Sequence, residues 1–421
     1  MIASVLRNRL AAACLIIGAA VGPPTSVCAA GANAGANAVA QRSCAALRDR
    51  VAAVAGEDGV LLRSYDDANG AGEPAEDALK TAAFTYDNAL AAIALLACGR
   101  PVEGARIGTA LRVAALGDAR LRNAYRAGPV AGKPLPNGWW DATQARWVED
   151  PYQSGSATGN VAWTALALLA LHDVSVDRRW LEAAGKLSRW VVVTTGDMPR
   201  DGFRGGVHGF DADPQKLGWK STEHNIDLAA MFAWLDAADS SRWHAEALRA
   251  RRFVTTQWDA ATGHFLVGTL PDGVTPNRST SALDVQLWAQ LLPGAPAEWR
   301  KALAYVEQAH AVPGGFDFND DRDGLWLEGT AQAALVYRVE ARVGDADRLL
   351  ATIARQFSRG GYVFATREPR ISTGLSLGST STTADFYYHR QPHLGATAWA
   401  ALAATGRNPF VAPRRKQAIP R

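Results

Sequence analysis

The sequence predicts an all-α fold, an (α/α)6 barrel or toroid in which six helical hairpins close into a ring with long loops on one face. Three observations support this fold class. Alanine makes up about a fifth of the 421 residues, and alanine has the highest intrinsic helix propensity. One helix-opening pattern recurs six times along the chain, and amphipathic segments lie between its copies.

The six recurring openings share one design. Each places a polar or small residue ahead of about ten to fifteen residues of almost wholly apolar character. A helix that is apolar on all sides is typically buried on all sides. The openings lie at 86–90, 159–163, 223–227, 283–286, 328–332 and 395–399.

Six amphipathic segments alternate with these buried helices. They lie at 41–54, 101–116, 177–193, 241–255, 297–308 and 345–357. A hairpin of one amphipathic and one buried helix cannot bury the second helix by itself. Six such hairpins bury it by closing into a ring, with the apolar helices inside and the amphipathic helices outside.

The connections between the helices are unequal in length. Turns after the buried helices are short, as at Gly99 and Arg100. The segments before the buried helices are long, and they lie at 117–156, 196–220, 258–280, 311–325 and 359–392. Long ordered loops in a compact domain usually carry function. All of them are predicted on the face where the inner helices begin, together with the positive ends of six helix dipoles.

Both ends of the chain are predicted to lie outside the ring. Residues 1–30 combine basic residues, a short apolar stretch and a cleavage-like Val27-Cys28-Ala29, which is typical of a secretory signal peptide. An uncleaved anchor is the alternative. Residues 31–40 are expected to be a flexible leader, 41–408 the (α/α)6 catalytic domain and 409–421 a basic flexible tail. We therefore expect a secreted or periplasmic protein without a membrane span after signal cleavage.

Two cysteines, Cys44 and Cys98, clearly remain after such a cleavage. In an exported protein they can pair, and a disulfide would then tie the first two predicted helices together. Two buried free thiols are the alternative. In either case two cysteines cannot supply the four sulfur ligands of a structural zinc site.

Composition and motifs exclude several other classes of protein. Lys and Arg number 44 against 41 Asp and Glu, a net charge of +3, which is too balanced for a protein built to bind nucleic acid. No run of about 20 apolar residues occurs. The chain also lacks nucleotide-binding and serine-nucleophile motifs. We expect no cofactor, and a monomer.

Two motifs with metal-like spacing are better explained without a metal ion. Residues 319–324 begin like a calcium loop, but Thr330 stands where the loop requires a glutamate. His389 and His393 have the spacing of a zinc pair, but Pro392 makes a continuous helix there doubtful. We therefore predict no metal site.

Aromatic residues are concentrated in the long loops. The chain has 14 Trp, and sugar rings pack their apolar faces on flat aromatic surfaces while their hydroxyls require polar partners. We therefore expect a carbohydrate substrate. The candidate contacts are Tyr86, Trp139, Trp140, Trp147, Tyr152, Trp219, His224, Trp326, Tyr387 and His389.

Carboxylic acids stand where the long loops meet the buried helices. Glycoside hydrolysis requires two carboxyl groups beside the scissile bond. Glu223 is the first candidate, because Ser221 can cap its helix and leave Glu223 free to project. Glu328 and Asp87 follow as further catalytic candidates. Asp150 with Glu149, Asp227, Asp284 and Asp385 occupy similar positions. For each of these acids, a plain capping role is the competing interpretation.

These openings together resemble the six-hairpin glycosidase superfamily. The resemblance covers about 41–409 and rests on Tyr-Asp-Asn-Ala-Leu at 86–90, Ser-Thr-Glu-His-Asn-Ile-Asp at 221–227 and Gly-Leu-Trp-Leu-Glu-Gly-Thr-Ala-Gln at 324–332. It implies one domain with its cleft at the inner-helix N-termini and, in many members, an inverting mechanism. Relatives on similar toroids include polysaccharide lyases and sugar epimerases, so the fold alone does not define the reaction.

The leading hypothesis is an exported glycoside hydrolase acting on an oligo- or polysaccharide, with Glu223 as acid and Glu328 or Asp87 as base. One alternative is a polysaccharide lyase that uses Tyr387 or Tyr388 with His389. Another is a glycan-binding protein of an exopolysaccharide pathway without turnover.

Overall fold

A computed structural model of the chain describes residues 26–66, 74, 76–117, 119–239, 242–376 and 386–412, with side chains from residue 35 onward. Most of the proposed signal peptide, Asp385 and the last nine residues of the tail lie outside the described residues. Within them, no helix has the length and apolar character required to cross a membrane.

The core is a ring of six inner helices, most of whose residues are fully buried. Each inner helix contacts the next, and the last contacts the first, so the ring is closed. The inner helices are α2 (Thr85–Ala97), α5 (Thr158–Ser175), α7 (Thr222–Ala238), α9 (Leu283–Leu291), α11 (Leu327–Val339) and α13 (Leu394–Thr405).

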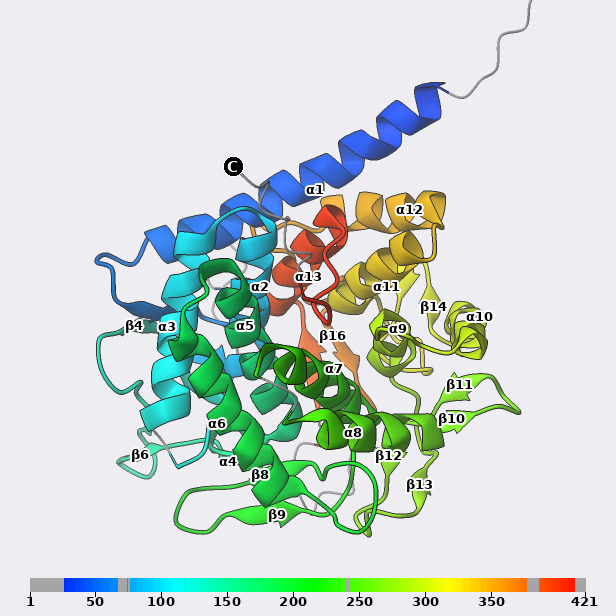
Figure 1. The fold of residues 1–421 in the computed structure, drawn as a ribbon. Coiled ribbons are helices and arrows are strands. Elements are labelled where there is room, and N and C mark those ends of the chain that lie inside the picture. Colours follow the sequence, from blue (N-terminus) through cyan, green and yellow to red (C-terminus); the bar gives the residue numbers. More distant parts are fainter. Residues whose placement is uncertain are drawn as a thin grey trace, which may run out of the picture.

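Six outer helices alternate with the inner ones along the chain, so the predicted (α/α)6 fold is confirmed (Figure 1). The outer helices are α1 (Ser26–Ala52), α3 (Pro101–Gly117), α6 (Arg178–Thr195), α8 (His244–Thr256), α10 (Lys301–Ala309) and α12 (Val343–Ala354). Three short helical pieces complete the set, α4 (Pro151–Ser154), η1 (Asp77–Leu79) and η2 (Ala297–Arg300).

The strands are short and lie in the segments before the inner helices. They form antiparallel pairs and one three-stranded sheet, β7-β8-β9. Several pairs, including β8–β9 and β12–β13, lie at the end of the ring opposite α1 in Figure 1. The strands are β1 (Gly59–Leu61), β2 (Ala82–Phe84), β3 (Ala124–Arg126), β4 (Gly128–Val130), β5 (Trp139–Asp141), β6 (Arg146–Val148), β7 (Ser156–Ala157), β8 (Gly206–His208), β9 (Gln215–Leu217), β10 (Trp258–Asp259), β11 (His264–Phe265), β12 (Gly268–Thr269), β13 (Pro276–Asn277), β14 (Ala311–Val312), β15 (Gly315–Phe316), β16 (Arg370–Ser372) and β17 (Tyr387–His389).

Helix α1 begins earlier than the sequence suggested. It starts at Ser26 and runs through the segment 31–40, which we expected to be a flexible leader. The alanines of this segment favour helix over coil. Farther along, α1 packs against α12 and α13 and covers the seam between the first and last hairpins.

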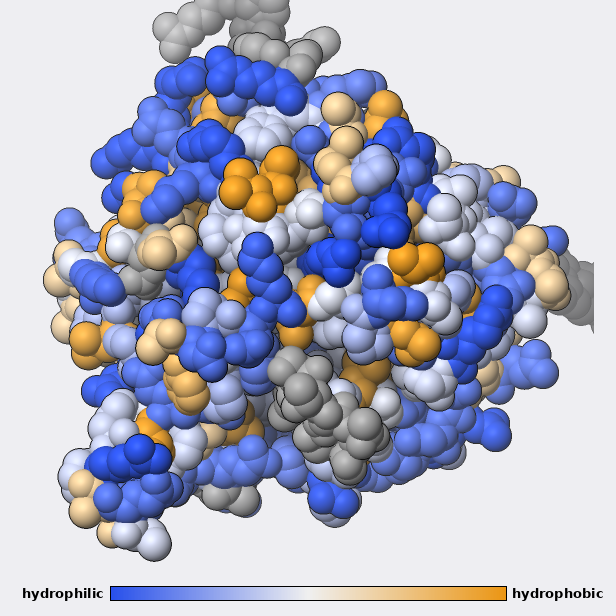
Figure 2. Space-filling model, turned by 90° about the horizontal axis from the view of Figure 1, so that it is seen from below, coloured by the Kyte–Doolittle hydropathy of each residue, from blue (hydrophilic) through white to orange (hydrophobic). Residues whose placement is uncertain are grey.

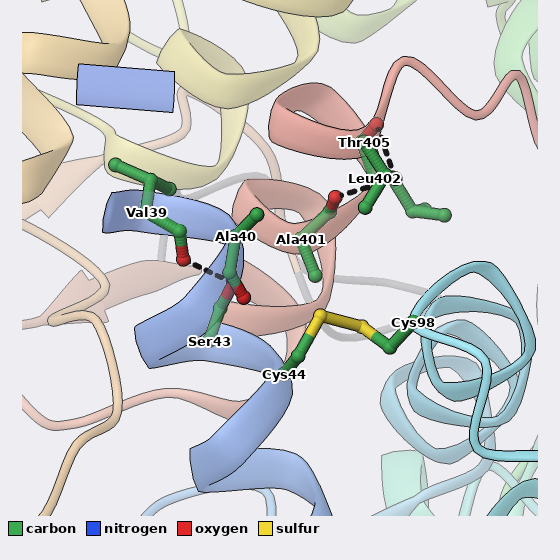
Figure 3. Close-up of a disulfide and its surroundings, with 8 residues drawn as sticks. All are labelled: Val39, Ala40, Ser43, Cys44, Cys98, Ala401, Leu402 and Thr405. Atoms are coloured by element: carbon green, nitrogen blue, oxygen red, sulfur yellow. Dashed lines mark hydrogen bonds between the residues drawn. A yellow bond between two sulfur atoms is a disulfide. The ribbon is translucent and has the colours of Figure 1, made fainter. Parts of the chain in front are cut away.

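A disulfide joins α1 to the end of α2. Cys44 and Cys98, which the sequence left either paired or free, are bonded with their Cα atoms 5.7 Å apart. Figure 3 shows the bond beside Ala401 and Leu402 of α13, at the closure of the ring. The bond spans 54 residues, and a loop of that length stabilises a fold by about 4 kcal/mol in the chain-entropy model.

The start of the predicted flexible tail is part of the core, which corrects that prediction. Phe410 is 2% exposed, and its ring lies 5.1 Å from that of Trp163 and 5.8 Å from that of Trp288. Asn408 anchors this segment by donating a hydrogen bond to the carbonyl oxygen of Leu291, at the end of α9. Burial of the Phe410 ring in this apolar axis is more favourable than its exposure to water. The chain therefore folds back across the far end of the ring.

Candidate active site

A cavity of about 650 Å³ opens where the inner helices begin. All six inner helices contribute a first-turn, second-turn or capping residue to its wall, and the face around it is largely hydrophilic (Figure 2). These residues are Tyr86 and Asp87 of α2, Asn160 and Trp163 of α5, Glu223 and His224 of α7, Asp284 and Trp288 of α9, Glu328 of α11, and the α13 cap His393. The cavity therefore lies at the N-termini of the inner helices, the face on which the sequence placed the long loops.

The floor of the cavity is an aromatic cluster in the second turn of the inner helices. Trp163, Trp288 and Trp399 lie 5.3 to 5.8 Å apart, centroid to centroid. Tyr86 packs edge-on against Trp163 at 5.5 Å. These side chains fill the axis of the helix ring and close the cavity from below.

One side of the cavity holds two carboxyl groups and a histidine. Glu328 accepts a 2.6 Å hydrogen bond at Oε1 from the Tyr86 hydroxyl, which in turn accepts one from Trp399 Nε1 at 3.0 Å. His393 lies between the carboxyls, with Nε2 3.4 Å from Asp87 Oδ2 and Nδ1 3.6 Å from Glu328 Oε2. This group links α2, α11 and α13.

The tautomer of neutral His393 follows from the cap of α13. His393 Nδ1 accepts a hydrogen bond from the Ala396 backbone N–H at 3.3 Å. The proton of the neutral ring is therefore assigned to Nε2, which faces Asp87. Asp87 and Glu328 also raise the pKa of His393 against the opposing effect of its burial.

Close approach of these groups requires a glycine at position 395. A Cβ atom there would lie 2.7 Å from Asp87 Oδ1 and 2.8 Å from Glu328 Oε2, closer than real Cβ contacts come. Glycine allows the backbone of α13 to come within reach of both carboxyl groups.

Burial sets the protonation of Glu328. Its side chain is 1% exposed, and desolvation raises its pKa to about 7, with a further increase from the negative charge of Asp87. His393 and the hydrogen bond from Tyr86 oppose this shift. Glu328 can therefore change its charge near neutral pH.

The opposite side of the cavity carries Glu223 and Asp284. Desolvation, followed by the negative charges of Asp284 and Glu328, raises the pKa of Glu223 well above its usual value. Desolvation raises the pKa of Asp284 to about 7. As predicted, Ser221 caps α7 by accepting a hydrogen bond from the His224 backbone N–H. Asp284, for which the sequence left a plain capping role as the competing interpretation, lines the cavity itself.

Asp227 lies one turn below Glu223 and is fully buried. Neither of its carboxyl oxygens has a hydrogen-bond partner among the described residues. Desolvation, followed by the charge of Glu223, raises its pKa well above the usual value. His224 is also desolvated, which lowers its pKa to about 4, so its ring is neutral at neutral pH.

Most predicted aromatic and histidine contacts line the cavity. The group consists of Tyr86, Tyr152, Trp219, His224, Trp326, Tyr387 and His389. Trp139, Trp140 and Trp147 are absent from the described lining. They belong to the β5–β6 hairpin, and a tryptophan in a loop does not reveal which way the loop faces.

Sequence reasoning missed two residues of the site. Tyr65, whose ring stacks on His393 with centroids 4.8 Å apart, comes from a segment without a recognisable motif. His393 was considered only as a metal ligand. His393 stands directly before α13, just as the cap Ser221 stands directly before α7. This position before the sixth opening was the signal that could have identified it.

The acidic loop before α11 offers the one group of possible metal ligands among the described residues, Asp317, Asp321 and Asp323. These carboxylates serve the loop itself. Asp317 accepts from the Gly324 N–H, Asp321 accepts from the Asp323 N–H, and Asp323 accepts from the Ser372 N–H. These contacts are those of a polar turn.

Comparison with known proteins shows the fold. A glycosidase structure shares 13% identity over 88% of this chain and 97% of its own, with a TM-score of 0.58. The cellobiose 2-epimerase of Spirochaeta thermophila shares 15% identity over 91% and 98%, at 0.59. A protein described as a novel α-amylase from Clostridium perfringens shares 9% over 87% and 97%, at 0.57.

The sequence-based comparisons found nothing. No family model matches the chain, and no curated protein matches it. The likeness to solved structures, at 15% identity or less, shows the fold of this chain. The proteins named here are carbohydrate-active enzymes, and they differ in the reaction they catalyse.

Proposed function

We propose that the chain is a glycoside hydrolase acting on an oligo- or polysaccharide, with Glu223 as general acid and Glu328 as base. One observation carries this proposal. Two carboxyl groups from different inner helices border a single aromatic-lined cavity and have unlike surroundings. Carboxyl groups held in unlike surroundings can divide the acid and base roles between them.

The surroundings of Glu223 favour its protonated form. Burial and two like charges raise its pKa, so at neutral pH it holds the proton that a leaving glycosidic oxygen needs. Glu328 differs because Tyr86 donates a hydrogen bond to it and His393 lies beside it. The Tyr86 hydroxyl stabilises the carboxylate, the form that can activate a water molecule, and so does the positive charge of His393 when its ring is protonated.

The lining of the cavity and the solved structures with the same fold suggest the chemical class of the substrate. Tyr152, Trp219 and Tyr387 offer flat surfaces beside polar groups such as Asn160, an arrangement that suits a sugar ring. Structures with this fold include a glycosidase in complex with glucose and cellobiose 2-epimerases. We therefore propose a substrate built from glucose units.

Hydrolysis by paired variants tests the proposal. Cello- and malto-oligosaccharides are incubated with the wild type, Glu223→Gln and Glu328→Gln, and products are separated by chromatography. Each substitution is expected to lower turnover by about 10²- to 10⁴-fold while the melting temperature is retained. Glu298→Gln, at an exposed position in η2 outside the cavity lining, is the control and should keep its activity. Full activity of Glu223→Gln would contradict its role, and binding without turnover in the wild type would favour the glycan-binding alternative.

Sugar epimerisation is the second candidate, because His393 and the neutral His224 both line the cavity. Epimerisation next to a carbonyl requires one group to remove a proton and another to return one. With cellobiose as substrate, hydrolysis releases glucose, whereas 2-epimerisation gives an isomeric disaccharide of equal mass. The same chromatogram separates these outcomes.

The lyase alternative has less support. Removal of a proton next to a uronic acid carboxylate is helped by a cation that binds the carboxylate. Among the described residues that line the cavity, Lys220 is the sole lysine or arginine, and its ammonium group is bound to Asp197 Oδ2 at 2.8 Å. His389, the expected partner of Tyr387 or Tyr388, lies 3.3 Å from Glu76.

A further inference from the structure

The β5–β6 hairpin exposes two large aromatic side chains outside the cavity. Trp140 is 61% exposed and Trp147 is 45% exposed. Both belong to strands that contact solvent along most of their length. Indoles are among the costliest side chains to leave in water, and clustered exposed apolar groups often mark a binding surface.

The register of the hairpin places both indoles on one face. Trp140 is paired directly with Trp147, whereas Trp139 is paired with Val148. Side chains of directly paired residues point to the same side of a sheet, about 5 Å apart at Cβ. The two exposed tryptophans therefore lie on one face of the hairpin, and we call this pair the Trp140/Trp147 platform.

Contacts beneath Trp147 hold its ring in place. The Arg126 guanidinium lies 4.7 Å from the ring centroid, a cation–π contact. Gly138 lies against the ring edge, since a Cβ there would come within 2.6 Å of Trp147 Nε1. An exposed ring that is already oriented loses little conformational entropy when it binds a ligand.

The platform adjoins the cavity. Strand β6 ends at Val148, and Asp150 and Tyr152 already line the cavity. Trp147 is three residues from Asp150, at most about 11 Å along an extended chain. Asp150 is fixed because its carboxylate caps α4 by accepting from the Gln153 backbone N–H at 2.8 Å. A linear polymer that extends out of the cavity past Asp150 therefore comes within reach of the platform.

We propose that the Trp140/Trp147 platform binds a glucan chain whose scissile bond lies in the cavity, so that the natural substrate is a polysaccharide rather than a disaccharide. This inference rests on the proposed function. Successive sugar rings can pack their apolar faces on the two indoles, which lie on the same face of the hairpin.

Binding is tested apart from catalysis by affinity electrophoresis. The Glu223→Gln protein is run in native gels containing mixed-linkage β-glucan, hydroxyethylcellulose, soluble starch or dextran. We expect at least one glucan to retard it. Trp140→Ala with Trp147→Ala should weaken that binding by roughly 5- to 30-fold, and Trp140→Phe with Trp147→Phe should largely restore it. Val193→Ala, at an 83% exposed position on α6, is the control.

Three results would overturn the platform. Wild-type protein that no glucan retards would do so, as would an alanine double variant that is retarded like its parent. A dimer seen by sedimentation in the wild type but absent from the double variant would instead make this face a contact between two copies.

Kinetics separates this proposal from the proposed function. The double variant should raise KM for the retarding glucan by a similar factor, while disaccharide turnover changes less than about twofold. Equal losses on both substrates would indicate a structural role and contradict the platform. Tryptophan-dependent retardation without hydrolysis of any glucan would instead contradict the hydrolase and leave the platform standing.

Discussion

The two ends of the inner-helix ring are made by the same six helices and have opposite chemistry. Where the helices begin, carboxyl groups, histidines and aromatic rings surround a cavity of about 650 Å³. Where they end, Phe410 fills the axis against Trp163 and Trp288. One end is open and polar, and the other is closed and apolar.

Helix polarity explains part of this difference. First-turn backbone N–H groups and helix dipoles favour negative charge at the open end. At the closed end the free carbonyl oxygens need donors, and side chains supply them. Asn408 donates to Leu291, and Arg338 donates to Ala403 and Ala404. Acidic side chains are thus tolerated where the inner helices begin, and hydrogen-bond donors are required where these helices end.

The open end also costs stability. The pKa values of Asp284 and Glu328 are raised to about 7, so the folded protein holds protons that the unfolded chain releases near pH 4. The contribution of these groups to folding therefore becomes less favourable as pH rises from about 4 through 7. The apolar closed end offsets this cost, and three substitutions test that contrast.

The largest expected effect is at the closed end. Phe410→Ala removes a ring that fills the axis and should lower the free energy of unfolding by about 3–5 kcal/mol. Turnover per folded molecule should fall less than stability, because Phe410 lies outside the cavity lining and reaches it only through the rings of Trp163 and Trp288. Denaturant titration measures the first quantity and initial rates the second.

Phe210→Ala is the matched control, since Phe210 is 43% exposed and should change stability by about 0.5 kcal/mol or less. Equal stability losses for the two variants would show that Phe410 does not close the ring.

The contrast between the ends also marks what sequence can predict. The fold was predictable because the alternation of apolar and amphipathic helices follows from burial alone. Ser221 and Glu223 were predictable because a cap and the first-turn residue two positions after it have a fixed relation to their helix. Phe410 was not, because a single aromatic residue among prolines and basic residues gives no periodic signal.

Side chains on loops were the least predictable part of the site. Trp219 and Trp147 look alike in the sequence, yet Trp219 lines the cavity and Trp147 lies outside it. The direction of a loop depends on contacts with distant segments, such as Arg126 against Trp147. The grouping of Asp87, Glu328 and His393 similarly depends on closure of the ring, which joins the first helix to the last.

The second substitution, Gly395→Ala, acts at the open end. Its Cβ would push apart Asp87 and Glu328, and overpacking of this kind costs about 1–3 kcal/mol. We expect turnover to fall by about 10- to 100-fold, measured as kcat/KM on the preferred oligosaccharide.

Gly344→Ala is its counterpart, because Gly344 is also the second residue of its helix and a Cβ there would meet only the Arg348 guanidinium, at 4.0 Å. That variant should keep its activity and gain up to about 1 kcal/mol of stability. If Gly395→Ala remained fully active, the carboxyl groups of Asp87 and Glu328, which face Gly395, would not be part of the reacting centre.

The smallest effect is expected for Tyr86→Phe. This substitution distinguishes whether Glu328 acts as the base or as the acid. Loss of the hydroxyl removes a donor to Glu328 Oε1 and destabilises the carboxylate relative to the acid, so the pKa of Glu328 rises from about 7. A hydrogen bond to a charged group contributes about 1.5–3 kcal/mol, so a shift of about one to two units is expected. Initial rates measured from pH 4 to 9 report it.

If Glu328 is the base, activity disappears as pH falls through its pKa, and Tyr86→Phe moves this acidic limb to higher pH. If Glu328 is instead the acid, activity disappears as pH rises, and the same substitution moves the alkaline limb to higher pH and widens the active range. Tyr305→Phe, on outer helix α10, controls for loss of a hydroxyl and should leave both limbs in place. A profile unchanged by Tyr86→Phe would remove Glu328 from either role, and the base would then be sought at Asp284, on the facing wall of the same cavity.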